Sequence, residues 1–225
     1  MFEFMKIRDR VYCLKFDNQY ELCMTFLRYE EFYESPNLKF QGHSFTIAEY
    51  MSWYTRTYGS GKNFYYPSDW GGFNIPVEII NKVRSAGISD PNHYDSFMWG
   101  IYGFINGCDP GSYLIGITDV CQLREHELTH AMYYIDDEYR AATAHIFDRT
   151  PIELITALSD ALLNEGYAPI TVMDEIQAYI TTGESDMFQD IKHDYFDTLR
   201  SQLIELHKKH FAAFCSPISS NSVSA

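Results

Sequence analysis

The sequence predicts an α+β protein with a small mixed sheet in its N-terminal half and a mostly helical C-terminal half. Two short segments with strand character carry the prediction of a sheet, Val11–Phe16 and Ser112–Thr118. After the second of these segments, the chain is predicted to be helical almost to its end. Because it contains no internal repeat and no low-complexity linker, residues 1–216 are expected to form one domain. The serine-rich residues 217–225 are expected to form a flexible tail.

Capping residues mark the helices expected in the N-terminal half. Thr46 and Glu49 form a capping box, which predicts a helix that runs to about Tyr58 and stops at the following glycine. The other helices expected here run from Asp17 or Asn18 to Tyr33, from Pro76 to Gly87, and from Asn92 to Ile105. The segments between them are expected to be a brief extended piece at Phe64–Pro67 and an ordered loop at Asp69–Pro76.

The C-terminal half is predicted to consist of helices joined by short connections. Five helices are expected, at about Val120–Ile135, Glu138–Phe147, Pro151–Asn164, Ile170–Thr181 and Ser185–Phe214.

Composition and charge narrow the classes of function. The formal net charge is −14, and a field of that sign repels phosphate backbones and anionic lipids, so neither nucleic acid nor a membrane is an expected partner. Five scattered cysteines without a CxxC pair argue against a disulfide framework or a zinc ribbon. The first ten residues lack the apolar core of a secretory signal, so a cytoplasmic site of action is expected. Export by a secretion apparatus would leave no such mark.

The run His126-Glu127-Leu128-Thr129-His130 fits the HExxH motif of zinc-dependent hydrolases. Residues four apart lie on one face of a helix, so His126 and His130 can bind the same metal ion. Glu127 projects about a hundred degrees away, where it can deprotonate a metal-bound water. The extended form with a third histidine is absent, because Tyr133 and Asp136 occupy the positions where glycine and histidine would be needed.

A third ligand is therefore expected on a later helix. Glu175 is the best candidate, since it shares its helical stripe with mostly apolar residues, and a half-buried acid needs a partner or a metal. Asp174 lies on a polar stripe that suits solvent. Tyr179, one turn after Glu175, is expected to assist catalysis by a hydrogen bond to a ligand histidine or to the water. Alternative ligands are Glu138, Asp160 and Glu165, and alternative donors to the transition state are Tyr134, Tyr139, His145 and Tyr167.

These two stretches, His126–His130 and Asp174–Tyr179, resemble the gluzincin class of zinc metallopeptidases. The resemblance implies a zincin-like fold, a Zn²⁺ ion held by two histidines and a downstream glutamate, and hydrolysis of a peptide bond in a protein or peptide substrate. Many gluzincins carry an aspartate four residues after the ligand glutamate, where this chain has Tyr179. In that class a strand beside the cleft pairs with an extended peptide, a part that Tyr113–Thr118 would take here.

Two other functions compete with a peptidase. In a non-catalytic binding or inhibitory protein, the metal would serve only to stabilise the fold. A fourth protein ligand would then complete its coordination and close the site. A di-iron protein could use Glu127 and His130 as an ExxH step, but such sites need a second ExxH, which the sequence lacks.

Overall fold

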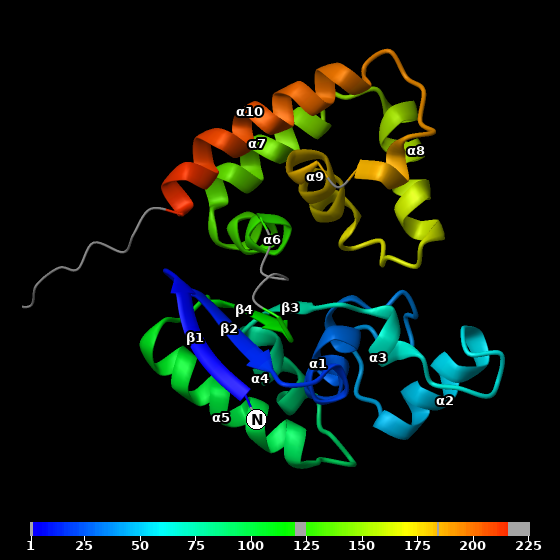
Figure 1. The fold of residues 1–225 in the computed structure, drawn as a ribbon, viewed down its shortest axis with the longest axis vertical. Coiled ribbons are helices and arrows are strands. Elements are labelled where there is room, and N and C mark those ends of the chain that lie inside the picture. The colour runs from blue at the N-terminus through cyan, green and yellow to red at the C-terminus, as the bar shows by residue number, and fades with distance from the viewer. Residues whose placement is uncertain (1, 120–124, 184, 216–225) are drawn as a thin grey trace, which may run out of the picture.

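The computed structural model describes residues 2–119, 125–183 and 185–215. Within them the chain forms a mixed α+β fold in which a small sheet lies between two groups of helices (Figure 1). The predicted α+β class is thereby confirmed. The expected helix start at Val120 and the expected tail at 217–225 lie outside the described residues.

The sheet has four strands in the order β1-β2-β4-β3, and it mixes parallel and antiparallel pairs. Its strands are β1 (Phe2–Arg8), β2 (Val11–Phe16), β3 (Phe73–Pro76) and β4 (Tyr113–Ile117). β2 and β4 are parallel neighbours, and β1 and β3 are the edges. β2 and β4 match their expected positions closely, whereas β1 was not anticipated.

One face of the sheet packs on the helices of the N-terminal half, which are α1 (Gln19–Glu34), α2 (Ile47–Thr57), α3 (Tyr66–Asp69), α4 (Glu78–Ser85) and α5 (His93–Cys108). The Asn18 cap of α1 and the full capping box of Thr46 and Glu49 confirm the predicted starts of the first two helices. The core between sheet and helices is rich in aromatic rings, which accounts for much of the aromatic content of the chain.

The other face of the sheet packs on α6 (Glu125–Ile135), and β4 is buried on both faces. Ile115 and the residues two positions before and after it on β4 face Leu128 and Ala131 of α6. Leu114, which points to the opposite side of the strand, faces the N-terminal core. Gly116 also faces α1, and a Cβ atom there would lie 2.5 Å from the Phe26 ring. The missing side chain therefore lets α1 approach the strand closely.

The remaining helices lie on the side of α6 that faces away from the sheet, and α7, α9 and α10 contact it directly (Figure 1). They are α7 (Asp137–Phe147), α8 (Ile152–Asn164), α9 (Val172–Thr182), the short 3-10 helix η2 (Ser185–Phe188) and α10 (Phe196–Phe214). They share a second apolar core, formed mainly by α8, α9 and α10. α9 packs directly on α6, and this contact brings the two predicted metal-binding stretches together.

Three predicted elements differ from the structure. Phe64–Pro67 is not extended, because Tyr66–Asp69 form a short helix whose first turn accommodates the missing N–H of Pro67. The expected loop Asp69–Pro76 ends in strand β3, so Pro76 closes an edge strand and does not open α4. The expected helix Ser185–Phe214 is interrupted between η2 and α10, where the N–H of Tyr195 donates to Nδ1 of His193.

None of the described helices combines the length and the apolar composition that a membrane-spanning helix requires.

Candidate metal centre

Helix α6 holds both histidines of the HExxH motif against its neighbours. Leu128 and Ala131 anchor one side of the helix on the sheet. The opposite side carries His126 and His130 toward α9, and the two residues are only 9% and 3% exposed. Imidazoles so deeply buried need polar partners for their ring nitrogens.

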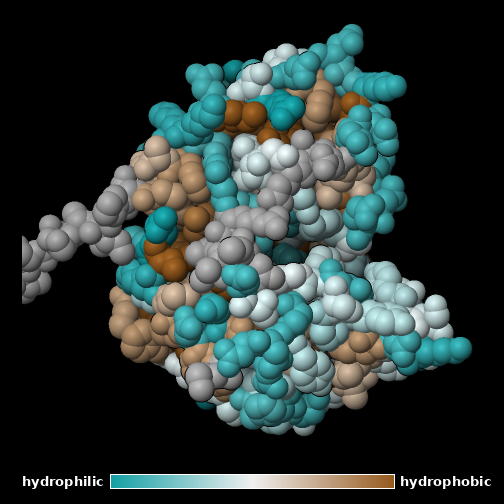
Figure 2. Space-filling view, in the orientation of Figure 1, coloured by the Kyte–Doolittle hydropathy of each residue, from teal (hydrophilic) through white to brown (hydrophobic). Residues whose placement is uncertain are grey.

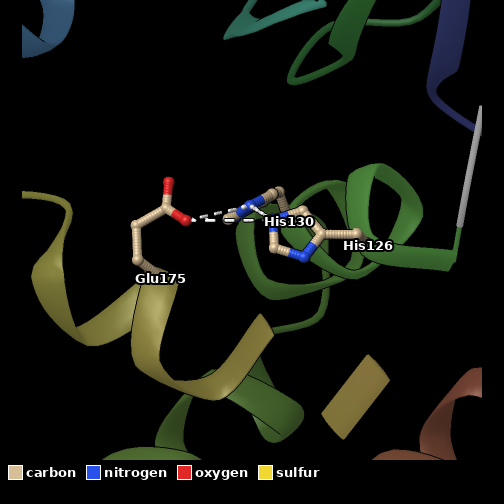
Figure 3. A group of neighbouring side chains, drawn as sticks. All are labelled: His126, His130 and Glu175. Atoms are coloured by element: carbon tan, nitrogen blue, oxygen red, sulfur yellow. Dashed lines mark hydrogen bonds and ion pairs between the residues drawn. The ribbon is translucent and has the colours of Figure 1, made fainter. Parts of the chain in front are cut away.

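Glu175 on α9 supplies a carboxylate to the same point (Figure 3). Its Oε2 atom lies 3.8 Å from Nε2 of His126 and 3.6 Å from Nε2 of His130, and the two Nε2 atoms are 3.0 Å apart. The structure thus brings together the three residues that the sequence predicted as metal ligands, and Glu175 is itself buried.

The outer ring nitrogen of each histidine faces a hydrogen-bond acceptor. Nδ1 of His130 lies 3.0 Å from Oδ1 of Asp174, so it carries the proton. Nδ1 of His126 lies 3.4 Å from Oγ1 of Thr182, whose hydroxyl already donates to the carbonyl of Ala178 and can therefore only accept. In the neutral form of each ring, these contacts place the proton on Nδ1 and leave a lone pair on Nε2, directed at the other histidine and at Glu175.

Two imidazole lone pairs and a carboxylate that converge in a buried site repel one another unless a cation lies between them. Tetrahedral bonds of about 2.0–2.1 Å place neighbouring ligand atoms about 3.3 Å apart. The separations of 3.0, 3.6 and 3.8 Å bracket that value. The donor set of two nitrogens and one oxygen could therefore hold a metal ion.

The pKa values of two of these candidate ligands, Glu175 and His130, depend on each other. Burial raises the pKa of Glu175 to about 8, although His130 opposes this shift. Burial lowers the pKa of His130, but the carboxylates of Asp174 and Glu175 outweigh it and hold that pKa well above its usual value. Without a metal, protons must take its place between these groups.

Asp174 corrects the prediction that it faces solvent. Its side chain is 22% exposed and pairs with His130, and its Oδ1 atom also accepts a hydrogen bond of 2.8 Å from Nε2 of Gln177. The Gln177 amide is oriented in turn by the hydroxyl of Tyr139, which donates to its Oε1 atom. Asp174 therefore has the position of the carboxylate that orients a metal-binding histidine, one residue before the ligand glutamate.

Glu127 points away from the ligand face and toward the sheet. Its Oε2 atom accepts a hydrogen bond of 2.9 Å from Nδ2 of Asn74 on β3. Asn74 pairs with Ile115 in the strand register, which places it on the α6 face of the sheet. The hydroxyl of Tyr113 donates to Oδ1 of Asn74 and so fixes the orientation of its amide. Asn74 was not anticipated as part of the site, because its contact with Glu127 depends on a strand that was predicted as a loop.

A cavity of about 300 Å³ joins these groups, and we call it the metal cavity. The ligands and Glu127 form one wall, Gly71, Gly72 and Asn74 form another, and Glu30 and Glu34 of α1 face them. Burial raises the pKa of Glu34 to about 7. Burial also holds the pKa of Glu30 well above its usual value, and repulsion from Glu34 adds to that shift. Neither acid was anticipated as part of the site.

Tyr179 and Tyr167 line the same cavity, and their hydroxyl groups lie 2.6 Å apart. The Tyr179 ring packs against the imidazole of His126, with the ring centres 4.7 Å apart. The other donor candidates lie elsewhere: Tyr134 donates to Glu78, Tyr139 to Gln177, and His145 is exposed. The alternative ligands Glu138, Asp160 and Glu165 are exposed and do not belong to the ligand group.

Strand β4 does not have the position expected for a peptide-binding strand. It lies between β2 and β3 and pairs with both, so neither of its sides is open to an added strand. The edge of the sheet on the side of the metal cavity is β3.

Comparisons of the chain with protein-family models, with curated proteins and with solved structures found no match.

Proposed function

We propose that the protein is a zinc-dependent metallopeptidase with a zincin-like fold of the gluzincin type. One observation carries the proposal: His126, His130 and Glu175 converge on one buried point, and Glu127 lines the same cavity. Among the described residues this ligand group has three members, and its open side faces the cavity. A structural zinc site would be closed by a fourth protein ligand, whereas a catalytic one keeps a position for water or substrate.

In the proposed mechanism, different residues of the cavity have different roles in amide hydrolysis. When bound, zinc would act as a Lewis acid and would lower the pKa of a water molecule in the site. Glu127, held in place by Asn74, would accept the proton of the attacking water and pass it to the leaving nitrogen. Tyr167 and Tyr179 line the cavity, and their paired hydroxyl groups are the candidates to donate to the developing oxyanion.

Strand β3 favours an extended peptide as the substrate. It is an edge of the sheet, it is preceded by Gly71 and Gly72 in the cavity wall, and it carries Asn74 beside Glu127. An edge strand offers main-chain groups to an added strand, and glycines let another backbone approach closely. A peptide paired with β3 would place its main chain next to the metal and the base.

Metal analysis and a matched pair of variants test the proposal. We expect about one zinc per wild-type chain, and its loss in His126→Ala and Glu175→Ala. Glu127→Gln should keep the zinc and lose at least about a thousandfold in peptide hydrolysis. Glu125→Gln changes an exposed carboxylate two residues earlier on the same helix and should keep both zinc and activity.

Full activity in Glu127→Gln would refute the mechanism. Zinc that is bound by the wild type without hydrolysis of any peptide would favour the non-catalytic binding protein.

A further inference from the structure

A second cavity of about 430 Å³ adjoins the metal cavity and shares Trp70, Tyr167 and Tyr179 with it. We call it the aromatic cavity. It lies between α1, α2 and α3 on one side and the segment before α9 on the other. In Figure 2 the outline of the molecule is indented between these two parts. Its volume is within the range of small-molecule sites.

The walls of the aromatic cavity combine aromatic rings with carboxylates. Tyr50, Trp53, Tyr54 and Tyr58 of the α2 region line it together with Trp70, and their rings pack on one another at steep angles. The described lining also contains Glu31, Asp69 and Glu165, but no lysine, arginine or histidine. The faces of aromatic rings attract cations, and Trp and Tyr do so most strongly.

Glu31 distinguishes this cavity from an ordinary apolar one. The residue is only 6% exposed, and its Oε2 atom is buried without a hydrogen-bond partner. The hydroxyls of Tyr50, Tyr66 and Ser35 lower the pKa of the carboxyl group, but burial outweighs them and raises it. An apolar occupant would leave the Oε2 atom without a donor, whereas an ammonium or guanidinium group would satisfy it.

We propose that the aromatic cavity binds the cationic side chain of a lysine or arginine in the peptide substrate. This inference rests on the proposed peptidase function, because the shared residues Trp70, Tyr167 and Tyr179 place the bound side chain beside the metal. Glu31 neutralises the cation, and the surrounding rings cover its stem. The net charge of −14 attracts such a substrate.

Binding to the inactive Glu127→Gln protein tests this without turnover. The probe is a fluorescein-labelled, alanine-rich octapeptide with one central lysine, compared with its arginine and norleucine counterparts by anisotropy. Because alanine fills the other positions, the peptide can shift its register until the long side chain reaches the cavity. We expect the two cationic peptides to bind at least about tenfold more tightly than the norleucine peptide, with or without zinc.

Variants assign the preference to individual residues. Glu31→Gln, made in the Glu127→Gln background, should remove most of the discrimination between lysine and norleucine. Glu165→Gln, at an exposed position on the same cavity, should change it by less than about twofold, because solvent screens that charge. Tyr58→Leu alters a ring that is 49% exposed, so it should leave the fold intact and weaken discrimination about threefold.

The outcomes separate this inference from the proposed function. Equal binding of the lysine and norleucine peptides, including no detectable binding of either, overturns the cationic subsite. A preference for lysine that persists in both Glu31→Gln and Tyr58→Leu also overturns the cationic subsite. The same holds for a preference that is lost only in Glu165→Gln. Hydrolysis by the wild type without a preference for lysine or arginine leaves the peptidase standing and the subsite refuted. A lysine preference that Glu31→Gln removes, in a protein that hydrolyses nothing, leaves the cation site standing and refutes the peptidase.

Discussion

Replacing Asp174 with asparagine should weaken zinc binding while leaving the geometry of the site intact. In the wild type, Oδ1 of Asp174 lies 3.0 Å from Nδ1 of His130 and accepts a hydrogen bond from Gln177. The amide oxygen of an asparagine can accept both hydrogen bonds, and the Gln177 donor selects that orientation of the amide. The substitution therefore removes the negative charge behind His130 and little else.

The expected size of the effect follows from the role of the carboxylate. Groups that orient and polarise a metal-binding histidine contribute about 10- to 100-fold to metal affinity, which is roughly 1.4–2.7 kcal/mol. The loss depends on pH, because Asp174 also raises the pKa of His130 and so favours the proton that competes with zinc. Asp174→Asn should lower that pKa. The deficit in zinc affinity should then be largest at pH 8 and smaller at pH 6.

Competition with a chromophoric chelator at both pH values measures this effect. Asp137→Asn, which removes the charge of an exposed carboxylate paired with Arg140, serves as the matched control and should not change zinc affinity. A zinc affinity of Asp174→Asn within twofold of the wild type at pH 8 would refute the positioning role. A deficit that grows as the pH falls would show that the argument about proton competition is wrong.

Three further predictions concern stability and the proposed catalytic base, Glu127. In the metal-free protein the pKa of Glu175 is raised to about 8, so its contribution to stability is present below pH 4.5 and is lost as the pH rises through 8. Melting temperatures in chelator should fall over that range, and less steeply in Glu175→Gln; an unchanged slope would contradict the assignment. Gly116→Ala should destabilise the fold by about 1–3 kcal/mol, because its Cβ would lie 2.5 Å from the Phe26 ring. Gly107→Ala, in α5 with open space around it, should be stabilising by about 0.5–1 kcal/mol in the same denaturant titration; equal effects of the two substitutions would refute the packing argument. Asn74→Ala should keep its zinc and lower kcat about tenfold or more by releasing Glu127, and loss of zinc would place Asn74 in the metal site instead.

Elements were predictable from the sequence where the residues that determine them lie only a few positions apart. The capping box of Thr46 and Glu49 acts within four residues, and both of its hydrogen bonds are present at the start of α2. The HExxH spacing is likewise a property of one helix, and it placed His126 and His130 together. Glu175 was predicted from a mostly apolar helical stripe. Such a stripe indicates that the residue is buried, but it does not indicate which element packs against it.

Features that depend on distant pairing were not predictable. Strand β3 has four residues, including Asn74 and Pro76, and it becomes a strand only by pairing with β4. The prediction for Asp174 failed because a polar stripe was taken to face solvent. In the structure α6 packs across both Asp174 and Glu175, which project about a hundred degrees apart, so one acid faces the outer nitrogen of His130 and the other its inner nitrogen. Glu30 and Glu34 join the cavity only because α1 lies opposite α6.

In the proposed peptidase, the residues around α6 that would bind the metal differ from those that would contact the substrate. The ligands and the carboxylate behind them belong to α6 and α9, within the helical C-terminal part. Glu127, one residue after His126, turns toward the sheet and is held by Asn74 on the edge strand. The aromatic cavity is walled mainly by the N-terminal part. Substitutions in α9 should therefore change metal affinity first, whereas substitutions at Asn74 or Glu31 should change turnover or substrate preference in a protein that still holds its zinc.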